Sequence, residues 1–223
     1  MEKTLAIRVI ILGAAFSLLS WSYGQDAGLV GHWTFDDPAN LGKDSVSTNN
    51  GVVVGGAYAF AFATARVGAG ALALDGTGGH LEVADNPALR FTIDQSYTVG
   101  AWVYVTTLSG GWEGVVNKSR NADPWYGFWI DPSHEWVAGG GATMIGTGVA
   151  LDDNGLPIQE WHQVAVVQDG AAGTRNLYVD GSLAATGASY DANGTGPLWI
   201  GGAASVSEFF AGLIDDVMRG RRP

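Results

Sequence analysis

The 223-residue chain contains no cysteine and few basic residues, and both shortages narrow its chemistry. Without cysteine it can form no disulfide, so its stability must come from its core, from oligomerisation or from a bound metal. Lys and Arg total 11 against 22 Asp and Glu, which gives a net charge of -11. Because phosphate backbones attract cationic surfaces, we do not expect nucleic acid as a partner.

The chain also lacks helical periodicity, whereas glycine (34 residues) and tryptophan (9 residues) are abundant. Short apolar runs alternate with Gly, Asp, Asn and Pro, a pattern that is typical of an all-β sandwich or barrel. Asp180-Gly181 indicates a type I′ hairpin turn, and Asn86-Pro87 indicates a capped helical turn. The expected strands are 29–35, 51–54, 71–75, 80–84, 97–105, 113–118, 126–130, 136–138, 143–145, 161–168, 174–179, 183–186, 197–201 and 208–217.

Residues 1–24 have the pattern of a secretory signal peptide. Lys3 and Arg8 precede an apolar run from Val9 to Leu19, and small residues precede a cleavage position after Gly24. The run is shorter than the roughly 20 residues of a membrane span, and the alternative is a buried N-terminal helix. We therefore expect a secreted or cell-surface protein with one domain over 25–223 and no membrane span after cleavage.

Several ordered motifs carry a resemblance to a known family. The chain resembles the laminin-G-like jelly-roll domains of the concanavalin-A-like lectin/glucanase superfamily. This resemblance implies an all-β, two-sheet antiparallel jelly-roll β-sandwich whose first and last strands are neighbours. The chain departs from the family pattern after Val217, where we expect a short last strand or a fragment of a longer protein. The motifs lie at 31–36, 44–51, 71–76, 97–103, 160–167 with 177–181, and 210–217.

The same resemblance implies a structural calcium ion. It assigns the ligands to Asp36, Asn50 and Asp215, because the first and last strands would bring carboxylates from both chain ends together. Calcium takes about six to eight oxygen ligands, which carboxylate, amide and carbonyl groups can supply. The alternative is that these are turn and sheet residues without a metal. Transition metals are not expected, since the four histidines never occur at paired spacing.

No catalytic motif is found in the sequence, although the fold also hosts glucanases and lyases. Retaining glycosidases need two carboxylates about 5 Å apart, usually on one strand face. No glutamate lies two residues from an aspartate within an expected strand, and the glucanase pattern Glu-x-Asp-x-x-Glu is absent. We therefore expect a protein that is not an enzyme.

Aromatic residues gather between positions 112 and 136. An exposed tryptophan on a rigid sheet can stack on a sugar ring, so we predict ligand-binding roles for Trp112, Trp125, Tyr126 and Trp129. The alternative is that these rings fill the core or brace loops.

Two functions remain open. The first is a carbohydrate-binding or adhesion module for a polysaccharide or glycan. The second is a structural or protein-interaction domain that binds another extracellular protein within a larger assembly.

Overall fold

The computed structural model describes residues 28–55, 65–120, 124–140, 143–152 and 157–221. This part of the chain is built from strands joined by turns and two short 3₁₀ turns, η2 (Pro87–Leu89) and η3 (Ala204–Val206). The signal peptide predicted for 1–24 lies outside the described residues. The strands are β1 (Leu29–Trp33), β2 (Gly51–Val54), β3 (Leu72–Asp75), β4 (His80–Val83), β5 (Tyr97–Val105), β6 (Glu113–Lys118), β7 (Tyr126–Ile130), β8 (Glu135–Gly140), β9 (Thr143–Ala150), β10 (Trp161–Asp169), β11 (Thr174–Val179), β12 (Ser182–Ala188), β13 (Leu198–Ile200), β14 (Gly202–Ala203), β15 (Glu208–Phe209) and β16 (Ala211–Arg221).

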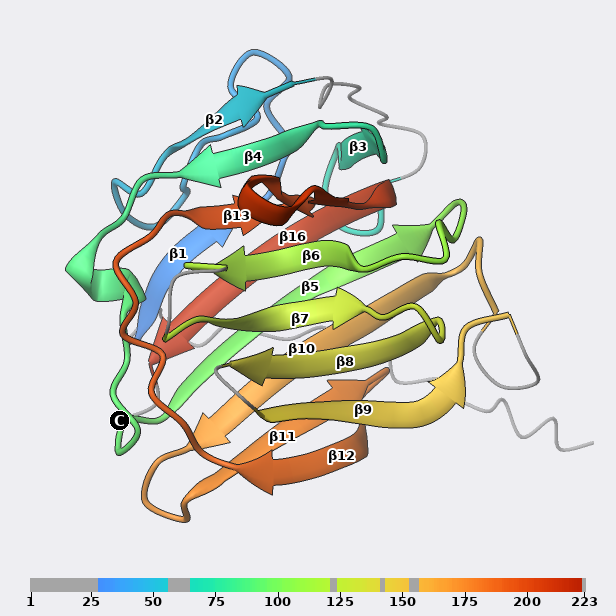
Figure 1. Cartoon of the computed structure of the whole chain (residues 1–223). Helices are drawn as coiled ribbons and strands as arrows, with labels where there is room; N and C mark the ends of the chain where they lie inside the picture. The colour runs from blue at the N-terminus through green and yellow to red at the C-terminus, as the bar shows by residue number, and fades with distance from the viewer. Residues whose placement is uncertain (1–27, 56–64, 121–123, 141–142, 153–156, 222–223) are drawn as a thin grey trace, which may run out of the picture.

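Two seven-stranded antiparallel sheets pack face to face (Figure 1). Sheet A has the order β1-β16-β5-β10-β11-β12, and β3 also pairs with β16. Sheet B has the order β2-β4-β13-β6-β7-β8-β9. The short pair β14-β15 contacts β6 and lies outside both large sheets. The predicted two-sheet antiparallel sandwich is therefore confirmed.

The core forms between the sheets because each long strand alternates buried and half-buried side chains. In β5, Tyr97, Val99, Ala101, Val103 and Val105 are buried, and the residues between them are only half-buried. On the outer face of sheet A, the Arg66 guanidinium lies 4.3 Å from the Trp102 ring centroid. Burial of one aliphatic or aromatic core side chain contributes roughly 1.5–3 kcal/mol, so this interior supplies the main stabilisation of a chain without disulfides.

The last strand, β16, joins the two chain ends. It pairs with β1 along one edge and with β5 along the other, so the first and last strands are neighbours, as predicted. The predicted strand 208–217 is instead two strands, β15 and β16, and β16 continues to Arg221. The expectation of a short last strand is therefore wrong. The register of β16 against β5 shifts between Asp215 and Met218, and Asp216 within that shift has a φ of 51°.

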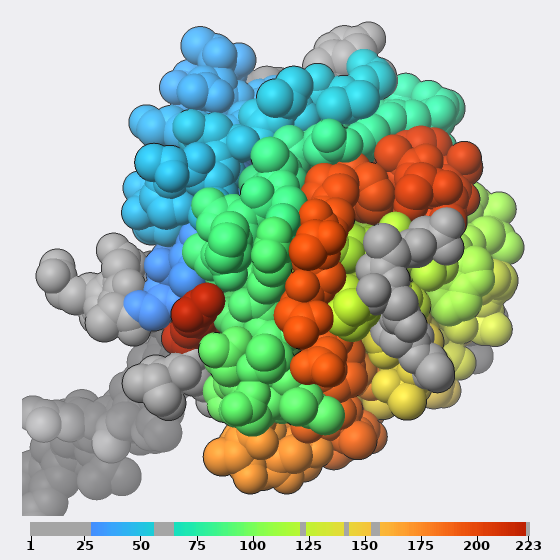
Figure 2. All heavy atoms as spheres, turned by 60° about the vertical axis from the view of Figure 1, so that its left-hand side comes forward, coloured from blue at the N-terminus to red at the C-terminus, as the bar shows by residue number. Residues whose placement is uncertain are grey.

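The segment that leads into β13 crosses one end of the sandwich beside the residues around η2 (Figure 2). Ala192 forms an isolated antiparallel bridge with Phe91, and the two residues exchange both backbone hydrogen bonds. The η2 turn has its predicted cap, since Asn86 Oδ1 accepts a hydrogen bond of 2.9 Å from the backbone N–H of Ala88. Among the described residues, no helix has the length and apolar character needed to cross a membrane.

Candidate functional site

The outer face of sheet B carries an aromatic and ionic group of side chains. Strand alternation sends Tyr126, Phe128 and Ile130 of β7 into the core, so Trp129 points to the opposite face. Trp125 meets Trp129 edge to face, with ring centroids 5.1 Å apart and an interplanar angle of 83°. The guanidinium carbon of Arg120 lies 4.6 Å from the Trp125 centroid and 5.8 Å from the Trp129 centroid. We call Arg120, Trp125, Trp129 and Glu208 the sheet-B cluster.

Glu208, which lies on β15, holds Arg120 and Trp129 in place, and these two side chains contact Trp125. Its carboxylate accepts hydrogen bonds from Arg120 Nε (3.0 Å) and Nη2 (2.6 Å), and from Trp129 Nε1 (3.0 Å). The β14-β15 pair is also fixed to sheet B by Asn117 Nδ2, which donates to Gly202 O at 2.7 Å. A two-bond contact between a guanidinium and a carboxylate fixes orientation as well as distance. The cluster is therefore a preformed surface.

The four aromatic residues that were predicted to bind a ligand differ in burial and in position. Trp125 is half-buried, whereas Trp129 is only 1% exposed because it packs under Arg120 and Trp125. Trp112 is 38% exposed and precedes Glu113, which pairs with Ile130. Trp125 precedes Tyr126, which pairs with Lys118, so Trp112 and Trp125 lie at opposite ends of the β6-β7 pair.

Tyr126 is a core residue, and its predicted ligand-binding role is wrong. The side chain is wholly buried, and its ring centroid lies 5.6 Å from that of Tyr97. Its hydroxyl donates to the carbonyl of Leu89 at 3.0 Å, and burial raises the pKa of this phenol above its usual value. A wholly buried ring cannot stack on a sugar. Trp129 likewise has too little exposed surface for that contact and instead supports Trp125.

The predicted calcium ligands Asp36 and Asp215 both bind the backbone stretch 66–70. Asp215 Oδ2 accepts from the N–H groups of Arg66 and Val67, each at 2.8 Å. Asp36 Oδ1 accepts from the N–H groups of Ala69 and, at 3.1 Å, Gly70. The fold thus brings carboxylates from both ends of the chain to the same short stretch.

Asp215 has the character of a group that a cation would satisfy. Its side chain is fully buried, and its second oxygen, Oδ1, has no hydrogen-bond partner. Burial is the largest effect on this carboxyl and raises its pKa to about 6, although two backbone N–H groups act in the opposite direction. A buried carboxylate with an unsatisfied oxygen is costly unless it gains a proton or a cation.

Asn50, the third predicted ligand, has a different use in the structure. Its side-chain oxygen accepts a hydrogen bond of 2.9 Å from the N–H of Asp44, so that oxygen is already engaged. The described residues hold no group of three or more His, Cys, Asp or Glu side chains that could bind a metal ion. A cation at this place would therefore rest on Asp36, Asp215, backbone carbonyls and water, which are ligand types that calcium accepts.

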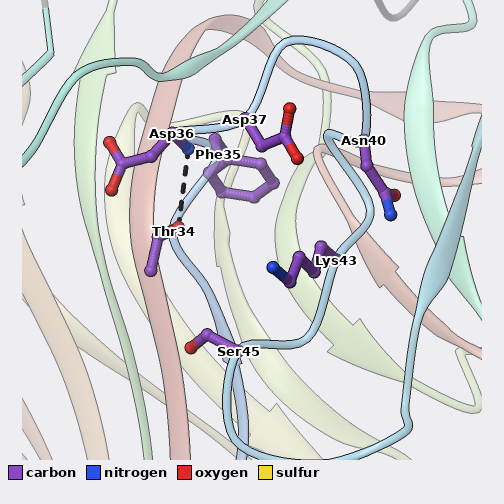
Figure 3. Close-up of a pocket in the computed structure, with 7 residues that line it drawn as sticks. All are labelled: Thr34, Phe35, Asp36, Asp37, Asn40, Lys43 and Ser45. Atoms are coloured by element: carbon purple, nitrogen blue, oxygen red, sulfur yellow. Dashed lines mark hydrogen bonds between the residues drawn. The ribbon is translucent and has the colours of Figure 1, made fainter.

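A small pocket lies in the loop that follows β1 (Figure 3). Its volume is about 170 Å³, and we call it the loop pocket. The Lys43 side chain points toward the space enclosed by the loop, whereas the Asp36 carboxylate points away from it (Figure 3). No residue of this pocket other than Asp36 was singled out from the sequence. The lining residues are Thr34, Phe35, Asp36, Asp37, Asn40, Lys43 and Ser45.

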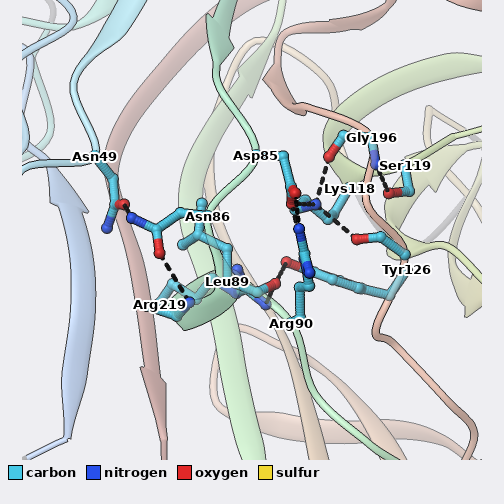
Figure 4. Close-up of polar contacts among 12 residues, drawn as sticks. Asn49, Asp85, Asn86, Leu89, Arg90, Lys118, Ser119, Tyr126, Gly196 and Arg219 are labelled. Carbon is cyan, nitrogen blue, oxygen red and sulfur yellow. Dashed lines mark hydrogen bonds and ion pairs between the residues drawn. The ribbon is translucent and has the colours of Figure 1, made fainter.

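A buried ionic network around Lys118 lies at the end of sheet B where β6 pairs with Tyr126 (Figure 4). The Lys118 ammonium is wholly buried and donates to Asp85 Oδ1 at 2.6 Å, to Gly194 O at 2.8 Å and to Gly196 O. Arg90 binds the same Asp85 carboxylate from the surface side. Burial lowers the pKa of Lys118, and the hydrogen bond to Asp85 opposes that effect. The network anchors the crossing segment to β6.

Sequence reasoning missed Arg120 and Glu208. Arg120 lies within the aromatic stretch 112–136, between Trp112 and Trp125, so a scarce cation among tryptophans was a usable signal. Glu208 carried no such signal, because its contact with Arg120 spans 88 positions and depends on where β15 folds back over β6.

Solved structures with a similar fold include both binding domains and enzymes. Domain 4 of the extracellular arabinanase AbnA from Geobacillus stearothermophilus, in complex with arabinotriose, has a TM-score of 0.66 at 20% identity, covering 88% of this chain and 94% of that one. The binding domain of Paraclostridial Mosquitocidal Protein 1 has a TM-score of 0.65 at 15% identity, over 87% of this chain and 49% of that one. Trypanosoma rangeli sialidase in complex with sialic acid has a TM-score of 0.61 at 18% identity, over 88% of this chain and 31% of that one.

Similarities at these identities establish the fold alone. No curated protein matches the chain. A family profile, Laminin_G_3, described as the concanavalin A-like lectin/glucanases superfamily, matches residues 75–219, which is well over half of the chain. The chain therefore belongs to the laminin-G-like family of the concanavalin A-like lectin/glucanase superfamily.

Proposed function

We propose that this protein is an exported, non-catalytic module that binds glycans through the outer face of sheet B. The observation that carries the proposal is the sheet-B cluster, in which a half-buried Trp125 ring is held by Arg120 and Trp129. A fixed aromatic ring next to hydrogen-bonding groups is suited to a sugar, which presents an apolar face and a rim of hydroxyl groups. The similarity to an arabinanase domain in complex with arabinotriose supports the same class of ligand.

The carboxylates on this face favour binding without catalysis. Glu208 is engaged by Arg120 and Trp129, and Glu82 accepts a hydrogen bond of 2.8 Å from Trp199 Nε1. A hydrolase of the two-carboxylate type would need one of these groups as a proton donor and another as a nucleophile or base. Both are instead committed to side-chain donors of the fold. The similarity to the sialidase covers only 31% of that enzyme, so it carries no argument for the same activity here.

A protein-interaction domain is the alternative, and a continuous apolar patch would favour it. The exposed large apolar side chains of the described residues are scattered. They are distributed over several elements: Val52 and Val54 on β2, Val67 and Ile93 in loops, Trp112 before β6, Met144 and Val149 on β9, and Leu183 on β12. This scatter supports the glycan hypothesis over the protein hypothesis.

Calcium binding at Asp36 and Asp215 is part of the proposal, with a structural role. The ion would satisfy the buried Asp215 Oδ1 and tie both chain ends to the stretch 66–70. It would supply no chemistry to a bound glycan.

Substitution of Trp125 tests the proposed function. The full chain and its Trp125→Ala variant are exported from an expression host and applied to an array of neutral and charged glycans. We expect the wild type to bind at least one neutral glycan, and the variant to bind it about tenfold more weakly because the stacking surface is lost.

Trp112→Ala is the matched control, since Trp112 is the more exposed ring and lies at the other end of the β6-β7 pair. It should leave the affinity unchanged. Wild-type protein that binds no glycan, or equal binding by the wild type and Trp125→Ala, would count against the proposal.

A further inference from the structure

The loop pocket is a preformed cavity that the sheet-B cluster does not account for, and Asp36 is its one lining residue to which the family resemblance gives a role. Its backbone is fixed by turns, because Asn40 N donates to Asp37 O at 3.0 Å and Lys43 N donates to Asn40 O at 3.1 Å. The N–H of Gly51 donates to Gly42 O at 2.8 Å and closes the loop against β2. Gly42 is required there, since a Cβ at that position would collide with the Gly51 carbonyl.

The base of the loop is equally constrained. Asp44 is buried, and its carboxylate accepts from the N–H groups of His32 (3.0 Å), Val46 (3.1 Å) and Asn49 (3.1 Å). Phe35 is only 2% exposed and has a φ of 59°, a conformation that the burial of its ring holds in place. A site on so restricted a backbone loses little conformational entropy when a ligand binds.

The groups around the pocket match the hydroxyl groups of a sugar. Lys43 and Asn40 offer N–H donors, and Asp37 offers a carboxylate acceptor. The hydroxyls of Thr34 and Ser45 also line the pocket, although that of Ser45 already donates to His32 O at 3.1 Å. Asp37 uses Oδ1 to accept from the N–H of Ala39 at 3.0 Å, which orients the carboxylate. Within the described part of the chain, no ion pair within 4.0 Å involves Lys43.

The charge and the volume of the loop pocket narrow the class of ligand that it can bind. The Asp36 carboxylate turns away toward Ala69 and Gly70, so the charges that remain are those of Lys43 and Asp37, which balance (Figure 3). A charged ligand would gain one attraction and one repulsion, whereas a hydroxyl group both donates and accepts. The volume of about 170 Å³ is below the range of about 300–1,000 Å³ for sites that enclose drug-sized ligands.

We propose that the loop pocket binds a single uncharged sugar residue at the end of a glycan chain, as a second site separate from the sheet-B cluster. The inference rests on the proposed glycan-binding function and adds a ligand class: the terminal residue of a neutral glycan. Lys43 and Asp37 contact adjacent hydroxyl groups of that residue, and Asn40 donates to a third.

The test compares two probes on the full chain: methyl glycosides of neutral monosaccharides, and an oligosaccharide that ends in the same residue. Binding is measured by isothermal titration calorimetry on the wild type, Asp37→Asn, Lys43→Met and Trp125→Ala. Asp169→Asn is the control, because its Oδ1 likewise caps a loop N–H, that of Ala172, on a different hairpin. Melting temperatures check that each variant is folded.

We expect Asp37→Asn and Lys43→Met to weaken methyl glycoside binding by at least about tenfold, since the first replaces a charged acceptor with a neutral one and the second removes a charged donor. Asp169→Asn should bind as the wild type does, and Trp125→Ala should lose affinity for the oligosaccharide only. Unchanged methyl glycoside affinity in Asp37→Asn and Lys43→Met would overturn the pocket proposal and leave the proposed function intact. A wild type that binds neither probe nor any array glycan would overturn both.

Discussion

At the scale of single residues, Lys118 shows how much of one end of the fold depends on one buried charge. Its ammonium meets one carboxylate and two carbonyl oxygens, and its side chain has no exposed surface. Arg90 binds the same carboxylate, but 31% of its side chain is exposed. The two cations thus share Asp85 under very different solvation.

Lys118→Met should lower the free energy of unfolding by about 3 kcal/mol, because it removes the buried donor of the Asp85 carboxylate and leaves two carbonyls without theirs. Arg90→Met should change the free energy of unfolding less, since the Arg90 side chain is 31% exposed and solvent weakens its pair with Asp85. Urea denaturation of both variants measures the difference. Equal stability of Lys118→Met and the wild type would show that the network does not anchor the crossing segment.

Residue-level prediction failed where burial depends on distant contacts. The alternation along 126–130 does place Tyr126 and Trp129 on opposite faces. The sequence could not show that Glu208 and Arg120 would cover Trp129, because those contacts need the long return of β15 across sheet B. Asp36 and Asp215 were brought to one stretch as the first and last strands implied, since that relation follows from strand pairing alone.

At the scale of elements, the turn residues were the sequence feature that predicted the structure most reliably. β5 has the predicted bounds, and the β11-β12 hairpin turns at Asp180-Gly181 with φ values of 50° and 76°. Strand ends were less predictable where pairing extends beyond the apolar run. β8 and β9 are longer than the predicted 136–138 and 143–145, because glycines and threonines there are held by neighbouring strands.

The turn of the β11-β12 hairpin gives a direct test of backbone strain. Gly181→Ala should lower stability by about 1 kcal/mol, because Gly181 has a positive φ although its Cβ would meet nothing within 4 Å. Gly111→Ala is the control, since a Cβ there is also uncrowded and Gly111 has no positive φ. Urea denaturation should separate the two variants, and equal stabilities would contradict the strained-turn assignment.

At the scale of the whole molecule, a chain without disulfides joins its two ends through β1, β16 and the carboxylates beside them. The raised pKa of Asp215, about 6 against 3.8, means that the folded state binds an extra proton between these values. Without a cation, stability therefore falls as pH rises from about 4 to 6, and the loss persists at neutral pH. A bound calcium ion would remove that loss.

Calcium at one hundred times its dissociation constant should stabilise the fold by about 2.7 kcal/mol, which raises the melting temperature by about 5–10 °C at pH 7. Asp215→Asn should abolish the response, and Asp169→Asn should retain it. Differential scanning calorimetry in calcium and in chelator measures the effect. Identical melting curves in both solutions would leave Asp36 and Asp215 as purely structural carboxylates.

The most direct test of the glycan-binding surface is an NMR titration of protein labelled with ¹⁵N at the tryptophan indoles, using the strongest-binding neutral oligosaccharide. Each indole N–H reports on its own surroundings, and Trp33 and Trp136 serve as internal controls because they are wholly buried in the core. We predict that the Trp125 and Trp129 signals shift in proportion to occupancy while those of Trp33 and Trp136 do not. Binding that leaves the Trp125 and Trp129 signals in place would contradict the account.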